Sequence, residues 1–83
     1  MLYRILTENV NLKGITELCN KFFPGFILIK AMGYRQNQAE QSLIIEIVTN
    51  DNEAVRQLAK DIKEMNSQQA VLIQSISIES WFE

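Results

Sequence analysis

The strongest constraint on this chain is the order of its segments, because β-rich stretches and stretches with helical spacing of apolar residues alternate along 83 residues. Residues 2–7 and 26–32 flank the first stretch with helical spacing, and residues 43–48 and 70–78 flank the second. This order predicts two successive strand–helix–strand units. Two such units, each with the usual right-handed crossover, combine most simply as one four-stranded sheet.

Both predicted helices have recognisable ends. Apolar residues recur at three- and four-residue spacing from Leu12 to Phe23, and Pro24-Gly25 stops that pattern. Asn50 and Glu53 resemble a capping box for the second helix, whose end we expect near Asn66. The polar residues 33–40 predict a hairpin with a long loop between the two middle strands.

These elements predict an α+β fold, a ferredoxin-like βαββαβ sandwich that forms a single domain over residues 1–83. Its antiparallel four-stranded sheet has the order 4-1-3-2, with two helices on one face. Alternation predicts the residues that face the helices, namely Tyr3, Ile5, Ile27, Ile29, Ile45, Ile47 and Ile73. The open face then carries Leu2, Leu6, Phe26, Leu28, Met32, Ile44, Val48, Leu72, Ile76 and Ile78.

An open sheet face of this kind predicts self-association, because monomeric soluble domains seldom expose large contiguous apolar patches. The same alternation sets four polar residues in one row across that face, Gln74, Arg4, Glu46 and Lys30. We predict an Arg4–Glu46 contact. The row either fixes register, pairs across a subunit boundary or contacts a ligand. With Leu28 and Ile76 it belongs to the predicted oligomer interface.

The terminal aromatic residues Trp81 and Phe82 belong to the same predicted interface. They are costly to leave in water, so we expect them to dock on a neighbouring subunit or on the first helix.

Composition argues against several functional classes. The chain has no histidine, and Cys19 is its one cysteine, so the common zinc sites and a disulfide framework are excluded. Neither Cys19 nor any serine has a histidine to activate it, which predicts a non-enzymatic protein without a metal or a cofactor. The net charge of −2, with scattered basic residues, disfavours nucleic acid as a partner. Since no apolar run is long enough for a membrane helix, we expect a cytoplasmic protein.

Two polar segments are candidate ligand sites. Tyr34, Arg35 and Gln36 combine an aromatic ring with a guanidinium, which suits a planar anion, although the segment is equally consistent with a solvated hairpin loop. The second segment, residues 66–69, includes Asn66, Gln68 and Gln69, which suit recognition of a base or an amide. Capping of the helix end is the simpler explanation there.

Several stretches resemble the PII-like superfamily, and within it the small trimeric CutA-type proteins. They are residues 24–34, 42–47, 50–63 and 70–73, with the terminal Trp81. The resemblance implies trimers packed through the open sheet faces, with small ligands, often nucleotides, in clefts between subunits. The chain departs from the family in lacking the long nucleotide-gripping loop of PII signal proteins and the histidine and cysteine positions linked to metals in CutA relatives.

Three hypotheses follow, from different functional classes. The first is a homo-oligomeric, trimeric binding module, regulatory or sequestering, that holds a small anionic metabolite or nucleotide between subunits. The second is a protein-interaction module or inhibitor of the kind found in phages and mobile elements. The third is a dimeric ferredoxin-like enzyme, which the lack of acid–base groups disfavours.

Overall fold

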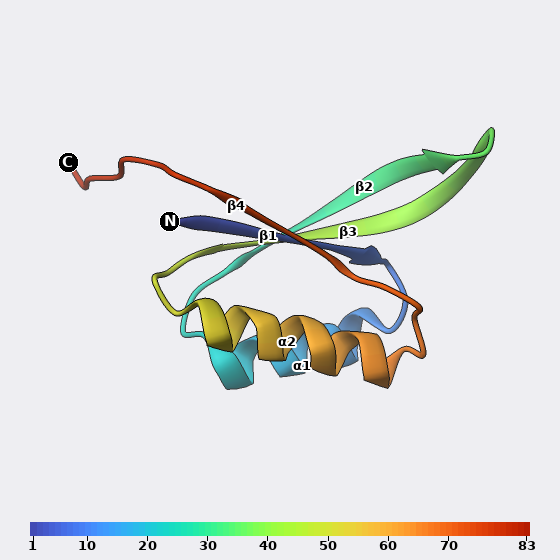
Figure 1. Cartoon of the computed structure of the whole chain (residues 1–83), viewed down its shortest axis with the longest axis horizontal. Coiled ribbons are helices and arrows are strands. Elements are labelled where there is room, and N and C mark those ends of the chain that lie inside the picture. Colours follow the sequence, from blue (N-terminus) through green and yellow to red (C-terminus); the bar gives the residue numbers. More distant parts are fainter.

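The structure is a computed structural model that describes residues 1–83, and its elements follow the predicted order (Figure 1). They are β1 (Leu2–Glu8), α1 (Leu12–Phe22), β2 (Ile27–Arg35), β3 (Gln38–Val48), α2 (Asn52–Met65) and β4 (Leu72–Ile76). The strands form one antiparallel sheet in the order β2-β3-β1-β4, and both helices cover one face of it. This is the predicted ferredoxin-like arrangement, numbered from the other edge of the sheet, and the prediction is confirmed.

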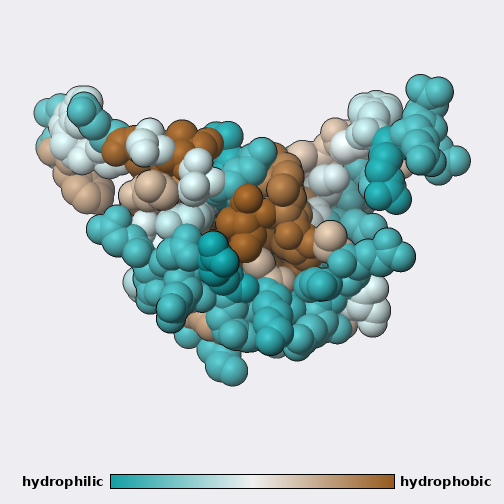
Figure 2. Space-filling model, viewed as in Figure 1, coloured by the Kyte–Doolittle hydropathy of each residue, from teal (hydrophilic) through white to brown (hydrophobic).

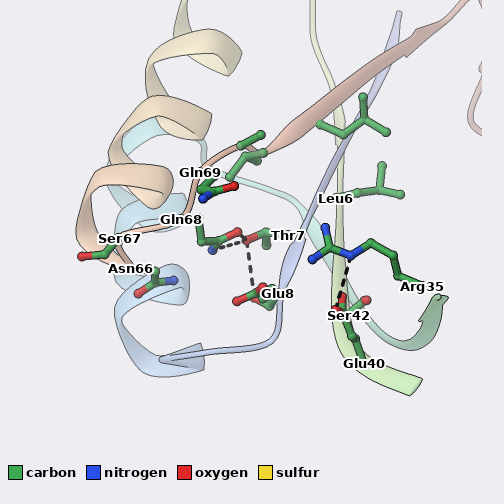
Figure 3. Close-up of a pocket in the computed structure, with 13 residues that line it drawn as sticks. Leu6, Thr7, Glu8, Arg35, Glu40, Ser42, Asn66, Ser67, Gln68 and Gln69 are labelled. Carbon is green, nitrogen blue, oxygen red and sulfur yellow. Dashed lines mark hydrogen bonds and ion pairs between the residues drawn. The ribbon is translucent and has the colours of Figure 1, made fainter. Parts of the chain in front are cut away.

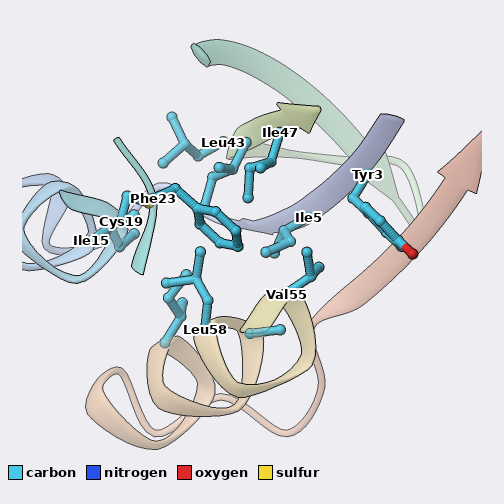
Figure 4. Packing of buried hydrophobic residues seen from close by; sticks show 12 residues of the cluster. Tyr3, Ile5, Ile15, Cys19, Phe23, Leu43, Ile47, Val55 and Leu58 are labelled. Carbon is cyan, nitrogen blue, oxygen red and sulfur yellow. The ribbon is translucent and has the colours of Figure 1, made fainter. Parts of the chain in front are cut away.

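Strand β1 lies in the centre of the sheet and sets its register. Arg4 lies opposite Glu46 on β3 and opposite Gln74 on β4, while Ile5 lies between Ile45 and Ile73. Alternate residues of β1 are buried under the helices, as an alternating strand requires. They join a single core between sheet and helices (Figure 4), which contains Tyr3, Ile5, Ile15, Cys19, Phe23, Leu43, Ile45, Ile47, Val55, Leu58, Ala59 and Ile62.

The predicted facing of β2 is wrong by one residue. Leu28 lies opposite the buried Ile45, and both Leu28 and Phe26 pack against the core instead of facing outward. Ile27 and Ile29 are the residues on the open face, where they are 58% and 39% exposed. The segment around them is apolar without alternation, so its sequence contains no signal for which side faces inward.

The same shift removes Lys30 from the polar row. Lys30 lies opposite the buried Leu43, which places it on the helix side of the sheet, and Met32 follows on that side. The position opposite Glu46 is taken by Ile27. Leu28 and Lys30 are therefore not part of the open face to which the sequence assigned them.

Each helix begins at an asparagine or aspartate cap. Asn11 accepts a hydrogen bond from the backbone N–H of Gly14 at 3.1 Å. A Cβ at position 14 would lie within 2.5 to 2.9 Å of the Asn11 side chain, so any other residue there would displace the capping side chain. The cap of α2 is Asp51, which accepts from the N–H of Ala54 at 3.1 Å, and not the predicted Asn50.

The hairpin between β2 and β3 is much tighter than predicted. The strands pair as far as Arg35 and Gln38, which leaves only Gln36 and Asn37 in the turn, with φ of 52° and 65°. Two central residues with positive φ define a type I′ turn. The polar residues that suggested a loop form a paired arm that extends beyond the helices (Figure 1), where no core demands apolar side chains.

Replacing Gln36-Asn37 with Asn-Gly should stabilise the protein by about 0.5 to 1 kcal/mol, because Asn-Gly adopts the type I′ turn with less strain. The measurement is the urea midpoint of unfolding. An unchanged or lower midpoint would contradict the type I′ assignment.

The thiol of Cys19 is fully buried in the core on α1. Burial raises its pKa from 9.0 to about 11, and a hydrogen bond to its own backbone opposes the shift only in part. A buried, protonated thiol of this kind is a packing group and a poor nucleophile.

Stability should therefore fall as the pH rises from about 9 to about 11. In that window the unfolded thiol ionises while the folded thiol stays protonated, so unfolding is favoured by up to roughly 1.4 kcal/mol per pH unit. Comparing urea midpoints of the wild type and Cys19→Ala across this range isolates the effect. Equal pH slopes for the two proteins would refute it.

Candidate functional site

A cavity of about 650 Å³ opens where three segments meet at one end of the sheet (Figure 3). The end of β1 supplies residues 6–8, and the connection from α2 into β4 supplies residues 66–72. The third side is the hairpin arm, which supplies Ser42 near its base, Glu40 further out and Arg35 beside the turn. The hairpin arm therefore forms one side of this cavity.

Two backbone hydrogen bonds end α2 and begin the connection to β4. The N–H of Ser67 donates to Glu64 O at 3.3 Å, and the N–H of Gln68 donates to Lys63 O at 3.0 Å. With Ser67 at a φ of 54°, this is the Schellman arrangement that commonly ends a helix. Helix capping is thus achieved without the side chains of residues 66–69, which remain free for other partners.

Two of those side chains join the connection to β1 and to the loop that follows it. Thr7 Oγ1 accepts from Gln68 Nε2 at 2.7 Å and lies 3.0 Å from Gln68 Oε1. Asn66 Nδ2 donates to the carbonyl of Val10 at 3.0 Å. Thr7 is the one buried polar residue of the chain, and its contact with Gln68 forms a part-buried corner of the cavity.

The charged groups of the cavity are of mixed sign. Arg35 Nε lies 3.8 Å from Glu40 Oε1, and the two side chains are 79% and 42% exposed. A pair this long and this exposed contributes little to stability. The Arg35 guanidinium is therefore available to an incoming anion, whereas Glu8 and Glu40 present carboxylates to any cationic group of the same ligand.

The structure brings together four of the six predicted ligand residues, since Arg35, Asn66, Gln68 and Gln69 all line the cavity. Tyr34 and Gln36 do not line it. Tyr34 projects from the opposite side of β2 to its neighbour Arg35 and is 77% exposed, and Gln36 occupies the turn.

Sequence reasoning missed the polar residues on the β1 and β3 sides, namely Thr7, Glu8, Glu40 and Ser42. The signal lies in the register, in which Glu8 pairs with Ser42 and thereby brings the end of β1 beside the base of the arm. The assumption that residues 33–40 form a loop hid this pairing.

The open face of the sheet carries much of the predicted interface. The Arg4–Glu46 contact is confirmed, with Arg4 Nε donating to Glu46 Oε2 at 2.7 Å. Gln74 stands beside Arg4, and Ile76 lies opposite Leu2 on the same face. Apolar side chains surround this polar row, including Leu2, Leu6, Ile27, Ile29, Ile44, Val48 and Leu72.

The terminal aromatic residues do not dock within the chain. Trp81 and Phe82 are 73% and 104% exposed, and the segment that follows β4 leads away from both helices (Figure 1). Docking on α1, one of the two sequence-based alternatives, is therefore not observed. The predicted strand 70–78 is shorter in the structure, where β4 ends at Ile76.

The arrangement is suited to binding. The cavity is lined by amide, hydroxyl and charged side chains. No cluster of three or more acidic or cysteine side chains is placed to hold a metal ion. Neither α1 nor α2 is long and apolar enough to cross a membrane.

Solved structures share this fold. A nitrogen regulatory PII-like protein, CPII, from Thiomonas intermedia K12, described as bound to ADP, AMP and bicarbonate, superposes with a TM-score of 0.69 at 13% identity, over 99% of this chain and 92% of that one. The periplasmic divalent cation tolerance protein CutA from Archaeoglobus fulgidus has a TM-score of 0.53 at 18% identity, over 99% and 86%. The fold is thus that of PII-like and CutA structures, as the sequence resemblance predicted.

A phage SAM lyase in its apo state is also similar, with a TM-score of 0.53 at 16% identity, over 99% of this chain and 91% of that one. No protein-family profile matches the chain, and no curated protein matches it in sequence. At these identities the comparisons establish the fold, and the function has to be argued from the site.

Replacing Thr7 with valine should destabilise the protein by about 1 kcal/mol, because the Gln68 side chain loses its partner in a part-buried corner. Urea unfolding of Thr7→Val and Thr7→Ser measures this. The serine variant keeps the hydroxyl and should lose less than half as much. Equal losses in the two variants would mean that the contact has no role.

Proposed function

We propose that this chain is a non-enzymatic, cytoplasmic binding module that assembles as a homotrimer and holds a small anionic metabolite or nucleotide at subunit clefts. The observation that carries the proposal is the cavity at the end of β1, where the loosely held Arg35 guanidinium faces the amides of Gln68 and Gln69. A guanidinium provides a bidentate anion contact, and the amides provide donors and acceptors for a base.

The open sheet face supports the oligomeric part of the proposal. It combines the Arg4–Glu46 pair with a surround of apolar side chains, of which Ile27, Val48 and Leu72 are each more than half exposed. A surface of this kind is typical of an interface between subunits. Packing it against other copies would also bring the cavity of one subunit close to its neighbours.

The ligand class is supported by the cavity and by one structural neighbour. An open cavity of about 650 Å³ falls within the usual range for small-molecule sites. CPII, which has the same fold, is described as bound to ADP, AMP and bicarbonate, all of which are anions. These three compounds are therefore the first ligands to test.

A second candidate ligand is favoured by the carboxylates of Glu8 and Glu40, which give the cavity more acidic than basic groups. SAM, S-adenosylmethionine, carries cationic groups and a carboxylate on one nucleoside, which matches such a mixed lining. The phage SAM lyase shares the fold. Binding of SAM would still fit the binding module, whereas its breakdown would identify an enzyme.

Two measurements test the proposal. Thermal shifts with ADP, AMP, bicarbonate and SAM test ligand binding, and native mass spectrometry of the same samples tests the oligomeric state. We expect trimers at micromolar concentration and a rise in melting temperature with at least one compound. Arg35→Ala should weaken binding of an anionic compound tenfold or more, because the charge-assisted hydrogen bonds are lost.

The matched control is Lys21→Ala, which removes an exposed positive charge from α1, far from the cavity lining. It should bind as the wild type does. A chain that stays monomeric would overturn the oligomeric part. Trimers without any ligand shift would overturn the ligand part and favour the protein-interaction module.

A further inference from the structure

A second hollow lies on the helix side of the sheet, between α2 and the edge strand β4. It has a volume of about 330 Å³ and is lined by Tyr3, Asn52, Arg56, Val71, Ile73 and Ser75. The space-filling view shows brown, apolar surface above the polar α2 (Figure 2). At about 30 Å³ per water molecule, the groove has room for roughly ten waters or one large side chain.

The polar rim of this groove consists of hydrogen-bond donors. Asn52 Nδ2 donates to Tyr3 Oη at 3.1 Å, and Arg56 Nε donates to Asn52 Oδ1 at 2.7 Å. These two bonds fix the three side chains and leave the Tyr3 hydroxyl proton and the terminal nitrogens of Arg56 free. No carboxylate lines the groove, and Arg56 has no ion-pair partner in the chain. The groove therefore suits a ligand with an apolar body and an acidic group.

The segment after β4 has the complementary chemistry. Trp81 and Phe82 are among the most exposed large apolar side chains of the protein. They stand between two acidic residues, Glu79 and Glu83, and this segment has no basic residue. Trp81 contacts only its own neighbourhood, donating from Nε1 to Glu83 Oε1 at 2.9 Å.

We infer that the groove between α2 and β4 receives the aromatic, acidic segment 79–83 of a second copy of this chain. An aromatic ring of Trp81 or Phe82 would cover Val71 and Ile73, and a glutamate would pair with Arg56. Stacking of Arg56 on the indole adds a cation–π contribution. The contact would give the Arg56 guanidinium an ion-pair partner and remove exposed aromatic surface from water.

The occupant belongs to another copy because of the direction of β4. Ser75 lines the groove and Ile76 ends the strand, after which the chain leads away from α2 (Figure 1). A segment that enters the next subunit in this way makes a head-to-tail contact, which closes into a ring when three copies surround an axis. The inference rests on the proposed self-association but concerns a different surface from the open sheet face.

Trp81 is the one tryptophan of the chain, so its fluorescence reports directly on docking. Its emission should shift to shorter wavelength, and become less accessible to iodide, as the protein concentration rises through the range of assembly. Arg56→Ala should reduce the shift by at least half, whereas Lys21→Ala should leave it unchanged. A shift that is independent of concentration would indicate docking within one chain and overturn the inference.

Disulfide trapping locates the contact. In a Cys19→Ala background, Ser75→Cys protein, which keeps Arg56 and places the thiol in the groove lining, should form a mixed cross-linked dimer with Phe82→Cys protein under mild oxidation. The matched control, Lys21→Cys mixed with Phe82→Cys, should form at least fivefold less. Equal yields, or trimers whose Trp81 stays exposed, would overturn the groove contact while leaving the cavity and its ligand tests unaffected.

Discussion

The position of β1 between β3 and β4 is the constraint on which the rest of this structure depends. Its inward residues enter the core and its outward residues form the centre of the open face, so one register determines both surfaces. The 2.7 Å contact between Arg4 and Glu46 marks that register on one side of the sheet, and Thr7 reaches Gln68 on the other. A shift of one residue would exchange the buried and exposed sets and dismantle the cavity as well.

How far the sequence predicts which side of a strand faces the core depends on how polar and apolar residues are distributed along that strand. In β1 and at the end of β3 one charged residue, Arg4 or Glu46, interrupts the apolar side chains, and the facing of both strands was predicted correctly, including the Arg4–Glu46 contact. The apolar run that begins β2 contains no alternation, and there the prediction failed for Leu28 and Lys30. The helices were found because their apolar spacing is regular, although the cap of α2 lies one residue beyond the predicted Asn50.

The candidate site was harder to predict, for a different reason. The amides after α2 and the guanidinium of Arg35 could be recognised as ligand-binding types, but their partners come from strand ends that meet only in the folded sheet. The polar composition from Gly33 to Glu40 suggested a loop. In the structure these residues form a two-stranded arm outside the core, where backbone hydrogen bonds between the strands do not require apolar side chains. The local sequence does not specify such contacts between residues that are far apart along the chain.

The two hollows described above lie near α2, one beside its first two turns and the other just beyond its C-terminal end. The helix itself is anchored by an apolar face that is buried in the core. Residues near the two ends of α2 can therefore contact different partners without changing the position of the helix. This arrangement allows assembly and ligand binding to occupy separate parts of one short chain.

The backbone hydrogen bonds that end α2 have a consequence for how such a protein can diverge. Because Ser67 and Gln68 close the helix through their N–H groups, the side chains of this connection are not needed to stop the helix. Substitutions at Gln69, whose side chain makes no hydrogen bond within the chain, can then change what the cavity recognises at little cost to folding. The same scaffold can thus acquire new ligands by changing a few side chains, consistent with a fold shared at 13% and 18% identity.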